Sequence, residues 1–596
     1  MILQNIDLAF VFGFFAISLL IGILTSRRAG KSFKDFFLSG QNMPWWLLGV
    51  SMVATTFSSD TPNLVADIVR QNGISGNWVW WAFLLTGMLT VFVYAKLWRR
   101  SKVLTDLEFY ELRYSGKEAA FLRGFRALYL GVFFNVMIMA TVSLAAIKIG
   151  AVMFGLTPFQ TIFWASIITV AYSSLGGLKG VMITDFFQFG IAMAGAIWAA
   201  VIAVNLPEVG GLTNLLAHEN VASKLDFLPD FSQWEIVIPV FILPLAIQWW
   251  SVWYPGAEPG GGGYIAQRMI SAKDEKNAVA ATFLFNIAHY ALRPWPWILV
   301  ALASLIVFPD LESLRQAFPN IDPGVVHHDL AYPAMLTFLP AGVLGLVVAS
   351  LIAAYMSTIS THLNWGSSYV VHDFYKRFIN PEASEKKLVL IGRISTVILM
   401  VFAGMFALLL QNALQAFNIL LQIGAGTGLI FILRWFWWRI NAWTEIVAMT
   451  FSFFLALYFE IIHIKLGFEP IPTHLKLIMA VGITTIVWLI ATYLTPKTDD
   501  KVLFNFVKKL HPGGPGWKKV IDEARARGEI LPSEKESWDV PSGILAMLVG
   551  SVAIYSILFG TGFWIYKNYI PALALTGVSI VCAYLLIRLI ARLKFE

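Results

Sequence analysis

The chain alternates long apolar stretches with shorter polar ones. A helix needs about 20 mainly apolar residues to cross a bilayer, and fifteen stretches approach or exceed that length. They lie at about 6–26, 44–70, 77–98, 124–155, 157–175, 181–204, 234–255, 277–308, 341–372, 388–410, 414–436, 442–463, 474–494, 541–563 and 570–592. This pattern predicts an all-α polytopic membrane protein with about 15 transmembrane helices.

The composition points the same way. Of the 596 residues, 58% are hydrophobic and 13% are charged, whereas soluble domains average about 25% charged residues. Too few charges remain to cover a soluble surface, which excludes a soluble enzyme, a disordered chain and a nucleic-acid-binding protein. The net charge of +7 does not indicate a polyanionic partner, because the charges lie at the ends of the predicted helices. The expected surroundings are the lipid bilayer, whose interfaces suit the 23 Trp and 46 Phe.

The distribution of Lys and Arg predicts the orientation. With the N-terminus outside and one crossing per stretch, most of the 43 Lys and Arg fall on the cytoplasmic side, and the C-terminus is cytoplasmic. The one long polar segment on that side, 495–540, is expected to form short surface helices around Pro512–Pro515. It is either a solvated linker on the anionic leaflet or a regulatory or docking element.

A break in a spanning helix frees backbone groups that must line a cavity or be buried in protein. The second stretch contains the sequence TTFSSDTP at residues 55–62. Pro62 cannot donate a backbone hydrogen bond and clashes with the carbonyl of Ser58, while Ser, Thr and Asp compete for nearby backbone groups. We expect an unwound mid-membrane segment that offers carbonyls to a cation and hydroxyls to a polar solute. Asp60, beside five hydroxyls, favours function over a purely structural kink.

Two further stretches carry oxygen-bearing side chains. Asp185 lies about one turn inside the sixth stretch, either as a helix-start carboxylate favoured by the dipole or as a buried cation ligand. The ninth stretch carries four clustered hydroxyls, those of Ser357, Thr358, Ser360 and Thr361. Hydroxyl, carboxylate and carbonyl oxygens suit a hard cation. No His, Cys and Glu set has the spacing of a transition-metal site, so we exclude a zinc or iron site.

The seventh and eighth stretches hold the remaining unusual residues. The run Pro255–Gly263, with Glu258 as its only charge, is expected to be either a cytoplasmic loop or a re-entrant turn. The eighth stretch contains His289 and Arg293. Because a charged arginine facing lipid is costly, we expect Arg293 to face the bundle interior and to pair with an acid or a solute.

Four passages carry a resemblance to a known family. They are DFFLSGQNMPWWLLGVSMVATTFS, YSSLGGLKGVMITDFFQ, YIAQRMISAKDEKNA, and LIAAYMSTISTHLN with its trailing HDFY, in order across roughly residues 1–460. Through these passages the chain resembles the sodium:solute symporter family, which includes sodium–sugar, proline, iodide and sialic-acid transporters. The resemblance extends to the bacterial sodium–sugar symporters.

The resemblance implies a transport core of two inverted five-helix repeats whose broken helices meet at the membrane midplane. The core would cover residues 44–436, after a leading transmembrane helix and cytoplasmic link at 1–43. The rest of the chain would comprise peripheral helices at 437–494, the cytoplasmic polar loop at 495–540 and two additional C-terminal transmembrane helices at 541–596.

The resemblance also implies sodium ligands. At the family's principal sodium site the matching groups are the carbonyls of Ala54, Phe57 and Ala354 and the hydroxyls of Ser357 and Thr358. Some relatives have a second sodium site, built from an aspartate on the fifth core helix and hydroxyls on the eighth. The residues that match it are Asp185, Ser357, Thr358, Ser360 and Thr361. We therefore expect one or two transported sodium ions, with the complete hydroxyl set favouring two.

The solute site of sugar-carrying relatives lies between the first, third, sixth, seventh and tenth core helices. The matching candidates are Ser58, Asp60 and Thr61 on the first, Asn135 on the third, Tyr254 on the sixth and Gln422 on the tenth. The lysine that relatives carry on the seventh core helix is absent, and His289 or Arg293 is its candidate replacement. The arginine that would bind a carboxylate sugar is also absent. A neutral sugar or polyol is therefore favoured, and a cationic solute paired with Asp60 stays open.

These expectations describe a secondary active transporter, not an enzyme, that couples inward sodium flow to uptake of a small polar solute by alternating access. The alternatives are a sodium- or proton-coupled carrier of an amino acid or cationic solute, an uncoupled carrier, and a solute sensor on the same scaffold. A membrane enzyme would need a catalytic cluster near an interface, and no group of His, Asp and Cys offers one. The expected location is the inner (plasma) membrane of a bacterium, with a monomeric functional unit.

Overall fold

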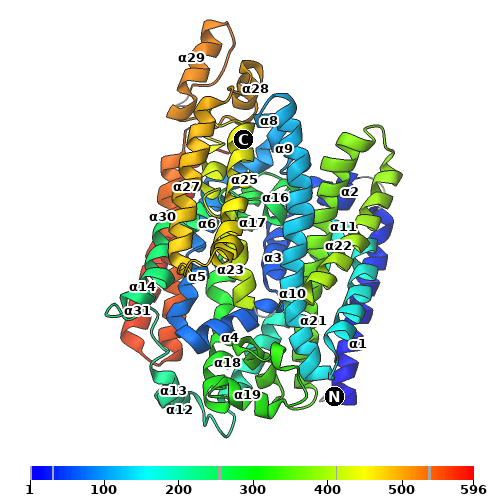
Figure 1. The fold of residues 1–596 in the computed structure, drawn as a ribbon, viewed down its shortest axis with the longest axis vertical. Coiled ribbons are helices and arrows are strands. Elements are labelled where there is room, and N and C mark those ends of the chain that lie inside the picture. Colours follow the sequence, from blue (N-terminus) through cyan, green and yellow to red (C-terminus); the bar gives the residue numbers. More distant parts are fainter. Residues whose placement is uncertain (1–2, 30–32, 253–257, 411–412, 534–537, 596) are drawn as a thin grey trace.

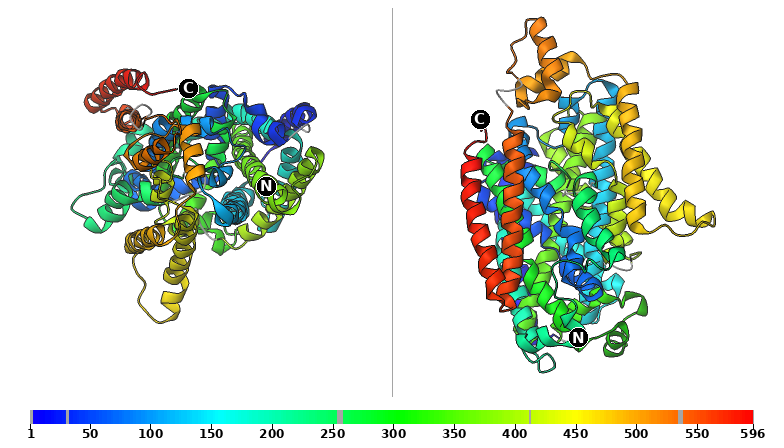
Figure 2. Two further views of the ribbon diagram at one scale, coloured as in Figure 1. Left: turned by 90° about the horizontal axis from the view of Figure 1, so that it is seen from above. Right: turned by 90° about the vertical axis from the view of Figure 1, so that its left-hand side faces the viewer.

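The protein is a bundle of long helices that run mostly along the long axis of the molecule (Figure 1). The computed structural model describes residues 3–29, 33–252, 258–410, 413–533 and 538–595. Over these residues the chain forms helices and two isolated β-bridges, and no strand. The N- and C-terminal regions lie toward opposite ends of the bundle (Figures 1 and 2).

Within the described residues, 11 helical segments are long and apolar enough to cross a membrane. They are Ile74–Ser101, Gly116–Phe154, Leu178–Val204, Trp234–Ser251, Glu275–Val307, Val343–Ile379, Glu385–Ala407, Ala442–Lys465, Thr473–Leu494, Val540–Ile565 and Tyr569–Ile590. Shorter apolar helices cover Asn5–Ile21, Trp45–Thr56 and Pro158–Ala171. The all-helical polytopic architecture is confirmed, while the total of 15 crossings stays a prediction.

One membrane pass is broken where the sequence predicts it. Helix α3 (Trp45–Thr56) ends before Phe57, and α4 (Asp60–Asn72) continues the pass. Pro62 lies in the first turn of α4, where a proline is tolerated because the first N–H groups of a helix have no partner within it. The last carbonyls of α3 likewise have no partner within α3, so they are available to side chains or ions.

A second pass is broken at the glycine-rich run. Its first half ends with α15 (Trp249–Ser251), and its second half is α16 (Gly263–Ser271). Residue Ala272, just after α16, forms a β-bridge with Met43, just before α3. The bridge places the two broken passes side by side at one end of the bundle.

The helix with the hydroxyl cluster, α21 (Val343–Ser368), packs along α11 (Pro158–Val204) and α1 (Asn5–Ala29). Asp7 of α1 fixes its start, because Asp7 Oδ1 accepts hydrogen bonds of 2.7 Å from the N–H groups of both Gly342 and Gly345. A carboxylate at a helix N-terminus satisfies such free donors. Two apolar helical segments of α11, Pro158–Ala171 and Leu178–Val204, correspond to the fifth and sixth predicted stretches.

Further helices pack on the two broken passes, either directly or through a neighbouring helix. They are α5 (Trp78–Trp81), α6 (Leu84–Leu89), α7 (Ala95–Ser101), α9 (Gly116–Leu128), α10 (Asn135–Phe154), α17 (Glu275–Ile287), α18 (Pro294–Val307), α22 (Glu385–Ala407), α23 (Ala413–Gly424) and α24 (Gly428–Leu433). Several are joined by π-helical turns, including Ala288–Leu292 between α17 and α18. Such turns are frequent at functional sites.

The C-terminal third lies around this bundle. Helices α25 (Ala442–Leu457) and α27 (Thr473–Leu494) form a pair whose connection projects away from the body (Figure 2). Helices α30 (Val540–Ile565) and α31 (Tyr569–Ile590) pack on each other, and α30 also packs on α6.

The polar segment 495–540 forms two short helices at one end of the bundle, α28 (Asp500–Leu510) and α29 (Lys518–Ala526) (Figure 1). Trp517, between them, is fully buried, and its indole Nε1 donates to Trp435 O at 2.9 Å. Its ring stacks on Phe506 with centroids 5.3 Å apart. The segment therefore docks on the bundle through aromatic side chains, which a wholly solvated linker does not do.

Candidate functional site

The first break brings the end of α3 against the hydroxyls of α21. Thr358 Oγ1 lies 2.6 Å from Thr55 O and 3.1 Å from Ala354 O. The five predicted ligands of the first sodium site are all buried, namely Ala54, Phe57, Ala354, Ser357 and Thr358. The carbonyl of Thr55, which the sequence did not single out, is the α3 oxygen that contacts Thr358. Neutral oxygens gathered in this way can coordinate a hard cation.

Asp185 is fully buried between α11, α3 and α21. Its Oδ1 accepts from Ser357 Oγ and its Oδ2 from Ser51 Oγ, both at 2.6 Å. Asp185 follows Leu178, the first residue of its apolar segment, by seven residues, so it lies beyond the first turn, where a helix-start carboxylate would be. A carboxylate buried this deeply is stabilised by a cation close by; a sodium ion at this site would supply one, and so does the buried Arg268, which Ser51 Oγ connects to Asp185.

The other predicted residues of the second sodium site lie on the same helix. Thr361 Oγ1 is 3.0 Å from Thr55 Oγ1 and so faces α3. Ser360 Oγ donates to Ser357 O at 3.1 Å, within its own helix. Arg268 of α16, which the sequence presented only within a family passage, donates to Thr361 Oγ1 at 2.9 Å.

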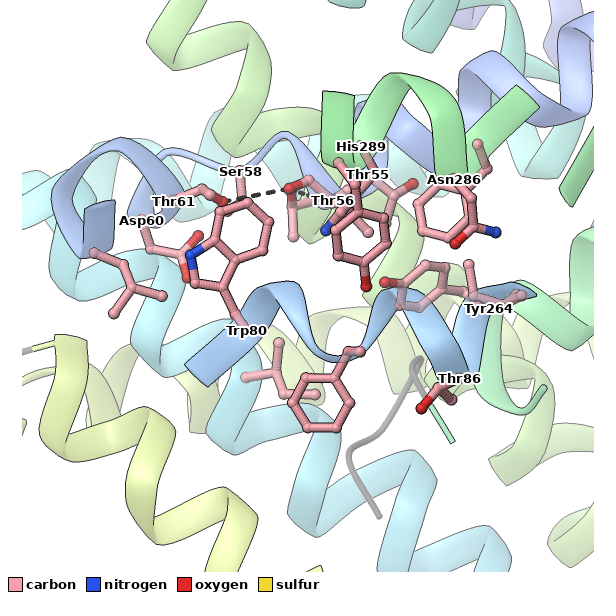
Figure 3. Close-up of a pocket in the computed structure, with 18 of the residues that line it drawn as sticks. Thr55, Thr56, Ser58, Asp60, Thr61, Trp80, Thr86, Tyr264, Asn286 and His289 are labelled. Carbon is pink, nitrogen blue, oxygen red and sulfur yellow. Dashed lines mark hydrogen bonds between the residues drawn. The ribbon is translucent and has the colours of Figure 1, made fainter. Parts of the chain in front are cut away.

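A cavity of about 180 Å³ lies beside the first break (Figure 3). Ser58, Asp60 and Thr61 line it from the break, and His289 and Arg293 line it from the seventh core pass. Figure 3 shows the indole of Trp80 reaching from its helix toward Ser58 and Asp60. Further lining residues are Thr86, Thr90, Thr141, Glu258, Tyr264, Thr282, Asn286 and His362. The cavity thus combines aromatic walls with many hydroxyl, amide and carboxylate groups, as solute sites do.

Several buried polar atoms on the cavity wall have no hydrogen-bond partner among the described residues. They are Ser58 Oγ, Asp60 Oδ1, Asn286 Oδ1 and His362 Nε2. Buried polar groups in folded proteins are nearly always paired. These atoms are therefore the groups that a bound solute or water would satisfy.

His289 and Arg293 both face the cavity but are bound to the end of α3. Arg293 Nη1 donates to the carbonyl of Thr56, and His289 Nδ1 lies 2.9 Å from Thr56 Oγ1. Arg293 Nη2 is also 2.9 Å from His289 Nε2. A cation is favourable at the C-terminal end of a helix, so Arg293 stabilises the break itself.

Glu258 lies in the second break and is only 2% exposed. Its Oε1 is 3.4 Å from Arg126 Nη2 and 3.6 Å from Arg434 Nη2, two arginines that are also buried. An exposed cytoplasmic loop therefore does not describe the position of Glu258. Residues 258–263 are all buried, and this ion-pair network holds Glu258 inside the bundle.

Two predicted solute residues do not lie on the cavity wall. Asn135 is fully buried, and its Nδ2 donates to His362 O at 2.7 Å. Gln422 is buried on α23, where Phe417 and Leu420 reach the cavity instead. Tyr254 lies outside the described residues.

Asn286 is a cavity residue that the sequence analysis missed. It precedes His289 by three residues and Arg293 by seven, so all three share one helix face. A buried amide in an apolar stretch, on the face of two other polar residues, was a detectable signal. The pairing of Glu258 with Arg126 and Arg434 gave no such signal, because the three residues come from distant passes.

Comparisons with known proteins agree with this arrangement. The family model described as the sodium:solute symporter family matches residues 36–451. A sodium/glucose cotransporter of Vibrio parahaemolyticus is 26% identical over 487 residues, covering 78% of this chain and 87% of that protein. The sodium/sialic acid symporter SiaT of Proteus mirabilis is 26% identical over 469 residues, covering 75% and 88%.

A solved structure shares the fold. It is described as the substrate-bound outward-open state of a Na⁺-coupled sialic acid symporter, and it matches with a TM-score of 0.67 at 22% identity. The match covers 83% of this chain and 99% of that chain.

Fold and comparisons together define the class: a multi-pass membrane transporter, not an enzyme, with a broken-helix inverted-repeat core. The chain belongs to the sodium:solute symporter family. Sodium is accordingly its coupling ion and a small-molecule solute its cargo.

Proposed function

We propose that the protein takes up a neutral polyhydroxyl solute, a sugar or a polyol, together with two sodium ions. The observation that supports this most strongly is the set of unpaired polar atoms on the cavity wall. Sugar hydroxyls can donate to Asp60 Oδ1 and Asn286 Oδ1 and accept from Ser58 Oγ. Each buried polar atom left unpaired costs about 1–3 kcal/mol, so a solute rich in hydroxyls is favoured over an apolar one.

The charges around the cavity favour a neutral solute. Arg293 is bound to the Thr56 carbonyl and to His289, so most of its donors are already used and it cannot offer both Nη groups to a solute carboxylate. Asp60 can accept from solute hydroxyls, as charged acceptors do in strong hydrogen bonds. Among the relatives, the Vibrio parahaemolyticus protein carries glucose in its name, in line with this proposal.

The proposed first sodium site uses the carbonyls of Ala54, Phe57 and Ala354 and the hydroxyls of Ser357 and Thr358. The proposed second site uses Asp185, Ser360 and Thr361, with Ser357 and Thr358 near both ions. Support comes from the contacts of Thr358 with Thr55 O and of Ser357 with Asp185. Moving one charge through ~100 mV yields roughly 2.3 kcal/mol, so two ions support about a 2,500-fold solute gradient.

The proposed membrane arrangement keeps the N-terminus outside and the C-terminus in the cytoplasm of the plasma membrane. Residues 44–436 would form the transport core, with 437–494, 495–540 and 541–596 as peripheral parts behind the leading segment 1–43. The proposed functional unit is a monomer.

The test is uptake into proteoliposomes under an imposed inward sodium gradient, with a potassium gradient as control. The panel contains radiolabelled glucose, mannose, myo-inositol, sialic acid, proline and choline. We expect uptake of a sugar or polyol only with sodium, with a Hill coefficient for sodium near two. Uptake that ignores sodium, or a clear preference for choline or proline, would refute the proposal.

A further inference from the structure

Arg268 is a buried positive charge that neither proposed sodium site uses. It lies on α16 and is fully buried. Its guanidinium donates to Thr361 Oγ1 at 2.9 Å and to Gln267 Oε1 at 2.8 Å, while its Nε and Nη2 each lie 3.3 Å from Ser51 Oγ. Arginine keeps its charge in proteins, so α16 places a permanent cation among these oxygens.

The same oxygens connect Arg268 to Asp185. Ser51 Oγ donates to Asp185 Oδ2 at 2.6 Å while it accepts from Arg268, so one hydroxyl lies between the two charges. Thr361, the other acceptor of Arg268, belongs to the proposed second sodium site. In this structure the guanidinium therefore holds oxygen atoms that surround the second ion position.

A sodium ion and a guanidinium repel each other strongly when they share ligands inside a protein, because screening there is weak. We propose that Arg268 is a positioning residue that acts as the tethered cation of the second sodium site. It neutralises Asp185 when the ion is absent, and it withdraws from Thr361 and Ser51 when sodium binds. This inference rests on the second ion site of the proposed function.

The location of Arg268 connects this exchange to the solute. Tyr264 lies four residues earlier on α16, on the same helix face, and it lines the solute cavity (Figure 3). Because α16 is one short helix, a displacement of Arg268 is transmitted to Tyr264. Filling of the second sodium site thereby changes the cavity in which the solute binds.

The test is a double-mutant cycle with Arg268→Gln and Asp185→Asn. The readout is the sodium concentration that half-saturates the rise in the thermal unfolding midpoint of the purified full chain, with potassium keeping ionic strength constant. We expect Arg268→Gln to lower this concentration about tenfold, because the competing cation is gone. In the Asp185→Asn background the same substitution should have no effect.

Arg70→Gln is the matched control, since Arg70 is a buried arginine that donates to Ser304 and Phe308 on the far side of the first break. It should lower the unfolding midpoint without changing the half-saturating sodium concentration.

If Arg268→Gln does not fold, Arg268→Lys provides the test. It keeps the charge, so its half-saturating sodium concentration should stay within about twofold of the wild type.

An unchanged or higher sodium concentration in Arg268→Gln, or an equal effect in both backgrounds, overturns the proposal. So does a tenfold fall with Arg268→Lys. The Asp185→Asn variant alone tests the second sodium site on which this proposal rests. If Asp185→Asn alone leaves the wild-type titration unchanged, the second ion site itself is absent, and the role of Arg268 falls with it.

Discussion

The two broken passes have similar positions in the bundle and different chemistry. At the first break, the carbonyls of Thr55 and Thr56 contact a hydroxyl of Thr358 and the guanidinium of Arg293. At the second break, Glu258 is buried with two arginines. Neutral oxygens can release an ion and bind it again, whereas a carboxylate already paired by buried arginines has little need of a further cation.

The comparison indicates that the two breaks have different roles. The first break is suited to bind an exchanging cation, and the second break is suited to hold distant passes together. Substitutions in the first break should therefore change the response to sodium. Substitutions in the second break should change the stability equally in any salt.

The largest expected effect is that of Glu258→Gln. Removing one partner of a buried ion-pair network leaves the arginines uncompensated and costs about 3–5 kcal/mol of unfolding free energy. The unfolding midpoint in detergent should fall equally in sodium and in potassium. Glu312→Gln is the control, because its ion pair with Arg315 is exposed and worth at most about 1 kcal/mol. A fall in the unfolding midpoint of Glu258→Gln that occurs only in sodium would contradict this structural role of Glu258.

Asp60→Asn should have the next largest effect, and it should weaken only the binding of the solute. Loss of a charged acceptor in the cavity costs about 1.5–3 kcal/mol of solute binding, so the half-saturating solute concentration should rise about tenfold or more. The sodium-dependent rise of the unfolding midpoint without solute should stay as in the wild type. The matched control is Glu208→Gln, an exposed carboxylate. A solute affinity unchanged by Asp60→Asn would exclude this aspartate from the solute site.

The first break was predictable from the sequence, because its causes are local. Pro62 and the hydroxyls around Ser58 act within a few residues of the backbone that they disrupt. The burial of Glu258 was not predictable, because it depends on Arg126 and Arg434, which only the tertiary fold brings near. Arg268 was hidden for the same reason: its partners Ser51 and Thr361 lie on two other helices.

The docking of the segment 495–540 shows the same limit. Its short helices follow from local signals around Pro512–Pro515, and the structure has α28 and α29 there. The burial of Trp517 against Trp435 depends on a surface formed by another pass. The local sequence pattern predicts the helices, whereas the residue that an aromatic side chain contacts depends on how the helices pack in the folded protein.

The smallest effects are expected for Asn135→Ala and Gln422→Ala. Neither residue lies on the cavity wall, so each should change the half-saturating solute concentration less than about threefold, which corresponds to under about 0.7 kcal/mol. Asn135→Ala should still lower stability by about 1 kcal/mol, since it removes the hydrogen bond to His362 O. A tenfold loss of solute affinity in either variant would mean that the cavity extends to these residues when solute is bound.

The most direct test of the division between the two breaks is a sodium titration of the unfolding midpoint for the wild type, Thr358→Val and Glu258→Gln, with potassium replacing sodium. Valine keeps the shape of threonine and removes the oxygen that contacts Thr55 O and Ala354 O. We predict that Thr358→Val needs at least about tenfold more sodium for the same rise, while Glu258→Gln starts from a lower midpoint and keeps the wild-type sodium dependence. An unaltered sodium dependence in Thr358→Val, or a lost one in Glu258→Gln, would contradict the assignment of ion binding to the first break.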